Sequence, residues 1–258
     1  MKRDSTANIL RVGFLVSIIC SVLVTGAAVL LRERQQENRV REKKRNVLVA
    51  AGVYRPGTSI EEEFARFRPV VVELATGLET DDNLIDVAAF DQRVASRDPA
   101  QRVAIPEVLD LARIKRRERF SVVYKAEADG KLDALVLPVN GSGLFSTLYG
   151  FIALESDLST IRGLTFYEHG ETAGLGAEID NPRWKAKWKG KRAFDAEGRL
   201  VIQVVKGGVD PTADDREFKV DGLSGATMTS NGVEELLRYW LGAHGFGPYI
   251  AMLRGKGN

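Results

Sequence analysis

Hydroxyl side chains gather in one short stretch of the chain, DGLSGATMTSNGVEELL at residues 221–237. Ser224, Thr227 and Thr229 surround a small Gly-Ala pair, and the pattern predicts an amphipathic helix starting just after them. A hydroxyl beside small residues and a helix N-terminus suits a phosphate group, because free backbone N–H groups and the helix dipole favour negative charge. No glycine-rich P-loop precedes the stretch, so it indicates a phosphate site of another kind.

Two further glycine-containing stretches could also contact a ligand. They are PVNGSGLFSTLYG at 138–150 and YEHGETAGLGAEI at 167–179. Glycines mark close backbone approach or positive φ, and most such turns are structural. Together, however, the three stretches supply small residues, hydroxyls and backbone N–H groups without a general acid–base cluster. This profile favours binding of a flat cofactor with a polar edge over hydrolysis.

Other site chemistries have less support. A serine hydrolase would use Ser224 with His169 or His244 as its base, but the GxSxG elbow is missing. The one cysteine, Cys20, excludes a disulfide within the chain and a four-cysteine cluster. The two histidines lack metal-ligand spacing. We therefore predict no catalytic side chain and no metal ligand in this chain.

The elements that must position these stretches indicate an α+β domain. A short helix is expected at 58–67, with Ser59 and Glu62 at capping-box spacing. Strands are expected at 120–126, 132–139, 150–155, 163–169 and 199–207, the first two forming a hairpin. The expected fold is a single domain with a mostly antiparallel sheet and packed helices.

A final helix is predicted from apolar spacing after residue 230. Its buried face would comprise Val233, Leu236, Leu237, Trp240 and Leu241. Asn231 is expected to be its N-cap, with Glu234 as the capping partner.

The N-terminal region predicts one membrane-spanning helix. Residues 12–31 carry no charge and are long enough to cross a bilayer, and Arg11 and Arg32 bracket them. We expect an uncleaved anchor, since the apolar run is too long for a signal peptide and is followed by charged residues. The remaining divisions are a short N-terminus at 1–11, a charged neck at 32–46 and one domain at 47–258.

Charge is distributed unevenly along the chain. Residues 1–45 hold 10 Lys/Arg and 4 Asp/Glu, whereas the remainder holds 27 Lys/Arg and 31 Asp/Glu. A mildly acidic body argues against nucleic-acid binding. The stretch RWKAKWKGKR at 183–192 could bind single strands through Trp184 and Trp188. Lipid headgroups, an acidic neighbouring subunit or plain solvation of a basic edge are better interpretations.

These residues carry a resemblance to a known family. The motif SGATMTS after VDG resembles the flavinylation motif of FMN-binding domains in redox-driven ion pumps. The stretch from GLFSTLYG at 143–150 to KWKGK, and the GFGPY tail at 245–249, resemble the C subunit of sodium-translocating NADH:quinone oxidoreductases over nearly the whole chain. The G subunit of related electron-transport complexes shares the motif and the ET-x-GLG turn, but fits the other segments less well.

The resemblance implies covalent FMN, attached by a phosphoester to Thr227. A separate flavin transferase would activate the hydroxyl, taking FMN from FAD with Mg²⁺. Asp221 and Ser224 fit the motif that the transferase reads, and Gly225 and Ala226 leave room beside the phosphate. An unactivated threonine hydroxyl is a poor nucleophile, which explains the need for the transferase.

Contacts to the isoalloxazine ring follow from the same resemblance. They would come from Glu171, Thr172, Leu175 and Gly176 of the ET-x-GLG turn, from Phe145 and Ser146, and from Lys206 toward the phosphate or ring edge. Ala173 replaces a proline that is usual in the family, which loosens the turn slightly.

The implied function is electron transfer inside a bacterial inner-membrane complex. The chain would pass electrons between redox centres of neighbouring subunits during quinone reduction coupled to Na⁺ export. The family places the domain in the periplasm and the N-terminus in the cytoplasm, whereas flanking positive charges favour the reverse. Membrane lipid is the other expected partner. The alternatives are a carrier like the G subunit of a ferredoxin:NAD complex and a membrane-anchored FMN-binding sensor or assembly module.

Overall fold

A computed structural model describes residues 6–80, 85, 87 and 90–256. Within this range the chain forms two units, one up to Lys43 and one from Lys44 onward. Helix α1 (Thr6–Ala50) belongs to the first unit up to Lys43, and its last turns belong to the second unit. The predicted span 12–31 and neck 32–46 are therefore parts of one helix, long and apolar enough to cross a membrane. Residues 1–5 of the predicted N-terminal segment lie outside the described residues.

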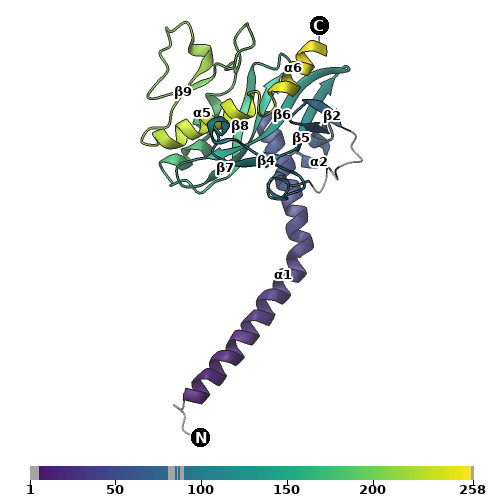
Figure 1. Ribbon diagram of the computed structural model, residues 1–258, viewed down its shortest axis with the longest axis vertical. Helices are drawn as coiled ribbons and strands as arrows, with labels where there is room; N and C mark the ends of the chain where they lie inside the picture. Colours follow the sequence, from purple (N-terminus) through teal and green to yellow (C-terminus); the bar gives the residue numbers. More distant parts are fainter. Residues whose placement is uncertain (1–5, 81–84, 86, 88–89, 257–258) are drawn as a thin grey trace. The chain divides into compact units, whose positions relative to one another are not determined.

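A six-stranded antiparallel sheet forms the centre of the second unit (Figure 1). Its order is β2-β1-β5-β6-β7-β8. The strands are β1 (Phe67–Glu73), β2 (Leu78–Thr80), β5 (Phe120–Ala128), β6 (Lys131–Ser142), β7 (Thr147–Glu155) and β8 (Ile161–Glu168). The predicted hairpin and the two strands after it are confirmed. Asp129 and Gly130 close the β5–β6 hairpin with φ of 51° and 74°, as a two-residue primed turn requires.

Two of the six strands were not expected from the sequence. Strand β1 contains Pro69, a residue that argues against a central strand, and it pairs with both β2 and β5. Before it, helix α2 (Ile60–Phe64) confirms the predicted short helix, and its N-cap Ser59 accepts a hydrogen bond from the Glu62 N–H at 3.4 Å. That helix ends before Phe67, because β1 starts there.

Between β2 and β5 the chain forms a small excursion. It contains α3 (Gln92–Ala95), β3 (Arg102–Ala104), the 3₁₀ helix η2 (Glu107–Leu109) and β4 (Arg116–Glu118). Strands β3 and β4 pair antiparallel in a sheet of their own.

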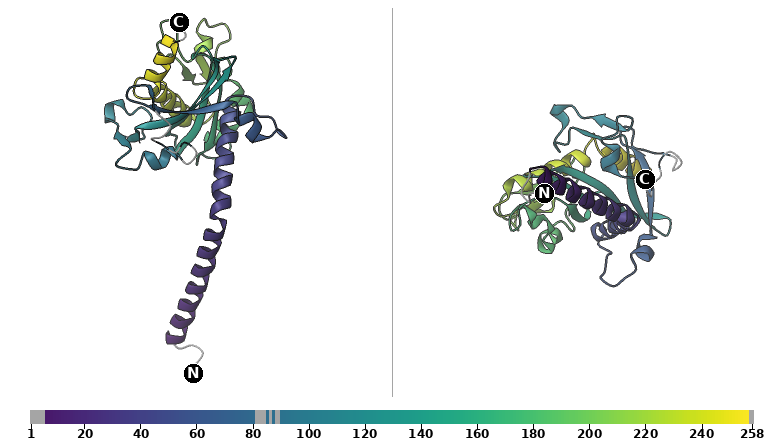
Figure 2. Two further views of the ribbon diagram at one scale, coloured as in Figure 1. Left: turned by 90° about the vertical axis from the view of Figure 1, so that its right-hand side faces the viewer. Right: turned by 90° about the horizontal axis from the view of Figure 1, so that it is seen from below.

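The remaining elements cover one face of the large sheet (Figure 2). They are η3 (Gly176–Asp180), α4 (Pro182–Ala186), β9 (Gln203–Val205), η4 (Arg216–Phe218), β10 (Lys219–Asp221), α5 (Thr227–Trp240) and α6 (Gly247–Lys256). The strand predicted at 199–207 is shorter than expected, and it pairs in parallel with β10 rather than joining the main sheet.

Helix α5 corrects one prediction. It starts at Thr227, with Ala226 as its N-cap, so Asn231 lies inside the helix and is not its cap. The carboxylate of Glu234 instead accepts a hydrogen bond from the Val204 N–H at 2.7 Å, which ties α5 to β9. The predicted apolar face is confirmed, since its five side chains are at most 1% exposed.

Each face of the large sheet packs against its own hydrophobic core. Along β6, Leu135, Leu137 and Val139 point into the core formed with α5 and α6. Ala134 and Val136 alternate with them and point into the opposite core, which contains the last turn of α1 and helix α2. The sheet is thus buried on both sides.

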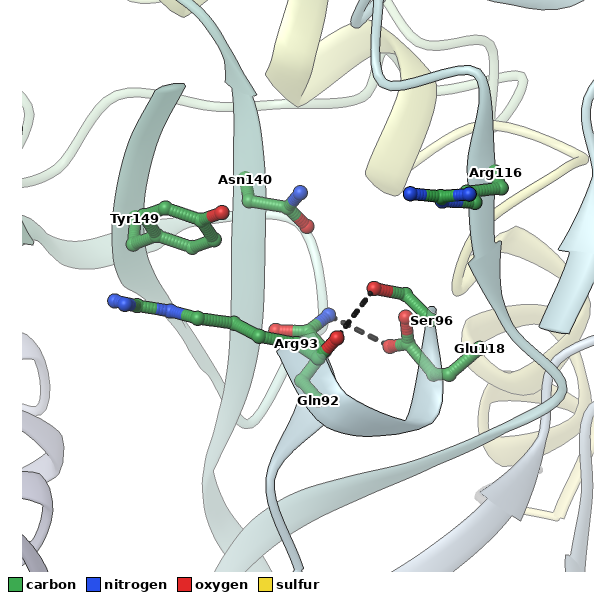
Figure 3. A pocket seen from close by; sticks show the side chains of 7 residues that line it. All are labelled: Gln92, Arg93, Ser96, Arg116, Glu118, Asn140 and Tyr149. Carbon is green, nitrogen blue, oxygen red and sulfur yellow. Dashed lines mark hydrogen bonds between the residues drawn. The ribbon is translucent and has the colours of Figure 1, made fainter. Parts of the chain in front are cut away.

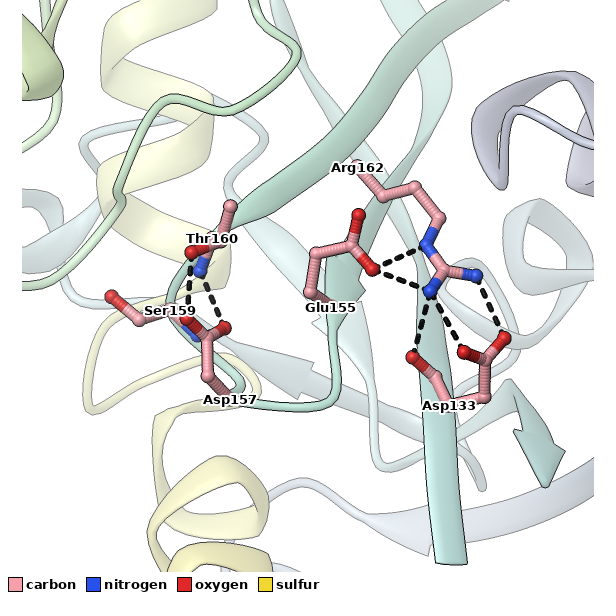
Figure 4. Close-up of polar contacts among 6 residues, drawn as sticks. All are labelled: Asp133, Glu155, Asp157, Ser159, Thr160 and Arg162. Atoms are coloured by element: carbon pink, nitrogen blue, oxygen red, sulfur yellow. Dashed lines mark hydrogen bonds and ion pairs between the residues drawn. The ribbon is translucent and has the colours of Figure 1, made fainter. Parts of the chain in front are cut away.

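An ion-pair network joins the start of β6, the end of β7 and the start of β8 (Figure 4). The guanidinium of Arg162 donates to the Asp133 carboxylate at 2.8 and 3.0 Å and to the Glu155 carboxylate. Asp157 accepts from the backbone N–H groups of Ser159 and Thr160, closing the β7–β8 turn. This end of the sheet is held by charge and turn geometry.

Candidate functional site

The first turn of α5 presents unpaired backbone donors. The N-cap Ala226 offers no side-chain cap, and in the described part of the chain the N–H groups of Thr227, Met228 and Thr229 have no acceptor. The first N–H bonded back along the helix is that of Ser230, to the Ala226 carbonyl at 3.0 Å. An anion placed here would meet free donors and the positive end of a 14-residue helix.

Thr227 is accessible at this helix start. Its side chain is exposed, as are Ser224 and Gly225, whereas Ala226 is buried. Gly225 adopts φ +73°, a conformation that disfavours any residue with a Cβ. A Cβ there would also lie 3.2 Å from a methyl carbon of Leu175. The structure therefore brings the stretches around 175 and 225 together, as expected from the sequence.

The third stretch joins the other two through Glu171. The Glu171 carboxylate accepts hydrogen bonds from the backbone N–H groups of Leu144, Phe145 and Ser146, at 3.0 to 3.2 Å. It also accepts one from the Thr229 hydroxyl of α5, at 2.6 Å. Burial opposes ionisation of Glu171, but these hydrogen bonds outweigh it and hold its pKa below the ordinary value.

Large apolar side chains remain exposed around this junction. The exposed fractions are 44% for Leu144, 68% for Phe145, 45% for Leu175 and 57% for Met228. They come from all three stretches, and Met228 lies in the same helical turn as the free N–H groups. Apolar cover beside an anion site suits a ligand with a flat ring and a phosphate.

Thr172 and Ser146 lie at the edges of the same junction. Thr172 is exposed, and its carbonyl accepts from the N–H groups of Leu175 and Ala177, both at 3.1 Å, which shapes the turn. The Ser146 hydroxyl accepts from the Gly170 N–H at 2.5 Å. Gly176 is buried, and a Cβ there would lie 2.6 Å from both the Glu171 carboxylate and the Thr229 hydroxyl.

Asp221 makes hydrogen bonds to other parts of the protein. Its carboxylate accepts from the Val209 N–H and from the Lys187 ammonium, each at 2.6 Å, and its carbonyl accepts from the Trp184 indole at 2.9 Å. Burial opposes ionisation here too, but these partners lower the pKa of Asp221. These contacts fix the position of the backbone just before the SGAT motif. Exposed Lys206 follows β9 beside it, and its contact with a phosphate or ring edge stays a prediction.

The geometry does not support the hydrolase alternative with His169 as its base. The Nε2 atom of His169 lies 2.8 Å from the Asp180 carboxylate, and its Nδ1 atom accepts from the Glu171 N–H at 3.2 Å. Both ring nitrogens are thus engaged, so His169 is not placed to activate Ser224. The described residues also contain no cluster of three or more possible metal ligands.

The basic tryptophan stretch is not a stacking surface. Trp184 is 5% exposed, Trp188 is fully buried, and their rings pack edge to face at 5.5 Å. Rings held in the core cannot receive nucleic-acid bases.

Sequence reasoning missed Thr229 as a site residue. It lies one helical turn before Val233 on the buried face of α5, and its side chain is fully buried. The available signal was this i to i+4 spacing, which was hidden because the helix was expected to start later.

Comparison with known proteins agrees with this geometry. The model of the FMN-binding domain family matches residues 143–242, a range that contains residues 143–150 of the first stretch and all of the other two. The C subunit of a Na(+)-translocating NADH-quinone reductase from Pseudomonas aeruginosa is 49% identical over 256 residues, covering 98% of this chain and 97% of that one. The corresponding C subunit of Haemophilus ducreyi is 43% identical, covering 98% and 96%.

The chain belongs to this C-subunit family. The crystal structure of NqrC from Shewanella oneidensis has the same fold, with a TM-score of 0.77 and 37% identity, and it covers 85% of this chain and 99% of that one. The resemblance to the C subunit and the α+β fold with an antiparallel sheet are thereby confirmed. An FMN-binding domain in a subunit of a Na(+)-translocating NADH-quinone reductase supports a role in electron transfer.

Proposed function

We propose that this subunit holds FMN covalently through a phosphoester to Thr227 and carries electrons between redox centres of neighbouring subunits. The observation that carries the proposal is an exposed threonine hydroxyl at an uncapped helix N-terminus, beside free N–H groups and exposed apolar side chains. FMN, when bound, supplies the electron-accepting chemistry, and this chain supplies attachment and orientation.

Attachment of FMN would need both a flavin transferase, which forms the bond, and groups of this chain, which bind the phosphodiester. A flavin transferase would place the hydroxyl oxygen of Thr227 on the FMN phosphorus of FAD, releasing AMP and the hydroxyl proton. The phosphodiester formed keeps one negative charge. The free N–H groups at the start of α5 would bind that charge, and Gly225 and Ala226 leave room for it.

Ring contacts are proposed from the surrounding stretches. Leu175 and Phe145 would pack on the apolar part of the ring, since both are largely exposed beside the helix start. Thr172, Ser146 and Lys206 would meet its polar edge or the phosphate. Permanent attachment makes occupancy independent of free FMN, which suits a domain located outside the cytoplasm.

The periplasmic location belongs to the same proposal. One N-terminal helix anchors the chain, and a long domain can translocate despite flanking positive charges. A Cys20→Ala, Ser156→Cys chain, whose new cysteine lies at an exposed position of the β7–β8 turn, should react with an impermeant maleimide in spheroplasts. Labelling only after lysis would place the domain in the cytoplasm instead.

Mass spectrometry tests the acceptor directly. The full chain and its Thr227→Val variant are each co-expressed with the flavin transferase and weighed intact. We expect the FMN adduct on the native chain and its complete loss in Thr227→Val, because valine has no nucleophilic oxygen. Thr58→Val, which removes an exposed hydroxyl elsewhere, should keep the adduct. An adduct on Thr227→Val would refute the assignment.

A further inference from the structure

The Glu171 carboxylate is enclosed by groups of the protein itself. Its residue is 8% exposed, and its oxygens accept the three N–H groups of the 144–146 turn and the Thr229 hydroxyl. One oxygen takes Phe145 and Ser146, and the other takes Leu144 and Thr229. Four donors on two oxygens nearly saturate a carboxylate.

The neighbouring glycines fit around this carboxylate. A Cβ on Gly143 would lie 2.5 Å from one oxygen of Glu171, and a Cβ on Gly176 would lie 2.6 Å from the other. Separations this short are not found for real side chains, so a Cβ at either glycine would displace the Glu171 carboxylate from this position. Both stretches therefore contribute to the space that the carboxylate occupies.

The segments that meet at Glu171 hold opposite ends of the proposed cofactor. Helix α5 carries Thr227 and the free N–H groups, hence the phosphate end. The 144–146 turn and the turn around Leu175 carry the exposed apolar side chains, hence the ring end. The Thr229 hydroxyl bond is the polar contact of Glu171 with α5, and it reaches the helix two residues after Thr227.

We propose that Glu171 is a positioning residue, which couples helix α5 to the ring-facing turns through Thr229 and does not itself contact the isoalloxazine. The proposal rests on FMN attachment at Thr227. It assigns Glu171 a different role from the ring contact that the family resemblance implies. A hydrogen bond to a charged acceptor in a buried site is strong and directional, so it can set the distance between the phosphate end and the ring end.

Two near-isosteric substitutions interrupt the coupling from opposite sides. Thr229→Val keeps the shape of the side chain and removes its hydroxyl donor. Glu171→Gln replaces one acceptor oxygen with an amide donor, which then faces donors. Thr229→Ser retains the hydroxyl and is the matched control. None of the three removes the Thr227 oxygen, so attachment should persist in all of them.

The experiment compares the flavin environment in these chains. Each full-length chain is co-expressed with the flavin transferase, purified in detergent and weighed intact. Quenching of flavin fluorescence by iodide, visible circular dichroism and the midpoint potential then report on the ring. We expect normal adduct mass in all chains, and iodide quenching raised about twofold or more in Thr229→Val and Glu171→Gln, as loss of a charge-assisted bond implies. Visible dichroism should fall and the potential should shift in these two variants, and Thr229→Ser should match the native chain.

The outcomes distinguish a failure of the positioning role of Glu171 from a failure of FMN attachment at Thr227. A native chain without FMN would refute the attachment at Thr227. A native chain with FMN, but with native quenching and potential in either Thr229→Val or Glu171→Gln, would overturn the positioning role. A contact that merely stabilises the fold would lower the melting temperature and leave the quenching and the potential unchanged.

Discussion

Some titratable residues in this protein affect the stability of the fold rather than the chemistry of the site. Glu118 on β4 is the clearest case, since it is only 1% exposed and accepts a hydrogen bond from the Gln92 side chain at 2.6 Å (Figure 3). It lines a cavity of about 20 Å³, enough for one water molecule, beside Asn140 and Tyr149. Burial raises its pKa to about 7, against the opposing effect of its hydrogen bonds and of Arg117.

This raised pKa predicts a pH-dependent stability. The folded state holds the Glu118 proton more tightly than the unfolded state. The contribution of Glu118 to the free energy of unfolding is therefore fully present below the unfolded pKa of about 4.5 and is lost as pH rises to about 7. Glu118→Gln removes this dependence. We expect its stability relative to the native chain to rise by about 2–3 kcal/mol between pH 4.5 and pH 8, measured by urea unfolding.

An exposed acid provides the comparison for Glu118. Glu61→Gln, on the solvent side of α2, should follow the native pH curve. If the curves of Glu118→Gln and the native chain run parallel, Glu118 is ionised throughout the range and the assignment of its pKa is wrong.

At the scale of elements, glycines determine how closely α5 approaches the end of β6. A Cβ on Gly232 would overlap the carbonyl oxygen of Ser142, and a Cβ on Gly141 would lie 2.5 Å from the Leu236 Cβ. Helix and strand are therefore in near-backbone contact at the point where the site is assembled. This contact places the start of α5 beside the 143–146 turn.

Gly232→Ala should therefore push α5 away from the sheet. Overpacking of this kind costs about 1–3 kcal/mol, which outweighs the usual helical gain of alanine over glycine. The measurement is the melting temperature together with the amount of FMN attached, and both should fall.

Gly255 in helix α6 is the matched control for Gly232. Nothing lies within 4 Å of a Cβ at this position, so Gly255→Ala should leave stability unchanged or raise it by about 0.5–1 kcal/mol. Equal effects of the two substitutions would show that helix propensity, and not the close approach to Ser142, controls the outcome at Gly232.

At the scale of the whole molecule, the anchor helix and the domain share a segment. The last residues of α1 and the residue that follows the helix are part of the domain core, with Val47, Leu48, Ala50 and Ala51 at most 1% exposed. The division between the two units therefore falls at Lys43, inside the helix and before its end at Ala50. The predicted boundary at 47 lies slightly inside the folded unit.

Two truncations test this boundary. A chain of residues 44–258 should be folded and soluble without detergent, since it lacks the apolar span and keeps the core segment. A chain of residues 53–258 should aggregate or melt at least about 10 °C lower, because losing four core side chains costs several kcal/mol of a marginal total. Equal melting temperatures of the two chains would show that residues 47–51 are dispensable.

Features that depend on local pattern could be predicted from the amino-acid sequence. An uncharged run of 20 residues predicted the anchor helix, and β-rich runs predicted β5 to β8. The SGAT motif singled out Thr227, because its meaning is local to those residues. Strand β1 was not predicted, since Pro69 argues against a central strand when the neighbouring strands are unknown.

The contacts that join the three stretches of the site could be found only in the folded chain. Leu144, Glu171 and Thr229 are far apart in the chain, and hydrogen bonds between distant residues leave no periodic signal in a single sequence. The same holds for Glu118, whose pKa depends on burial by segments from α3, β4 and β6. Burial and long-range pairing depend on chain topology, so the SGAT motif and the family resemblance that it carries could suggest the residue for attachment, but not the residues proposed to position the cofactor.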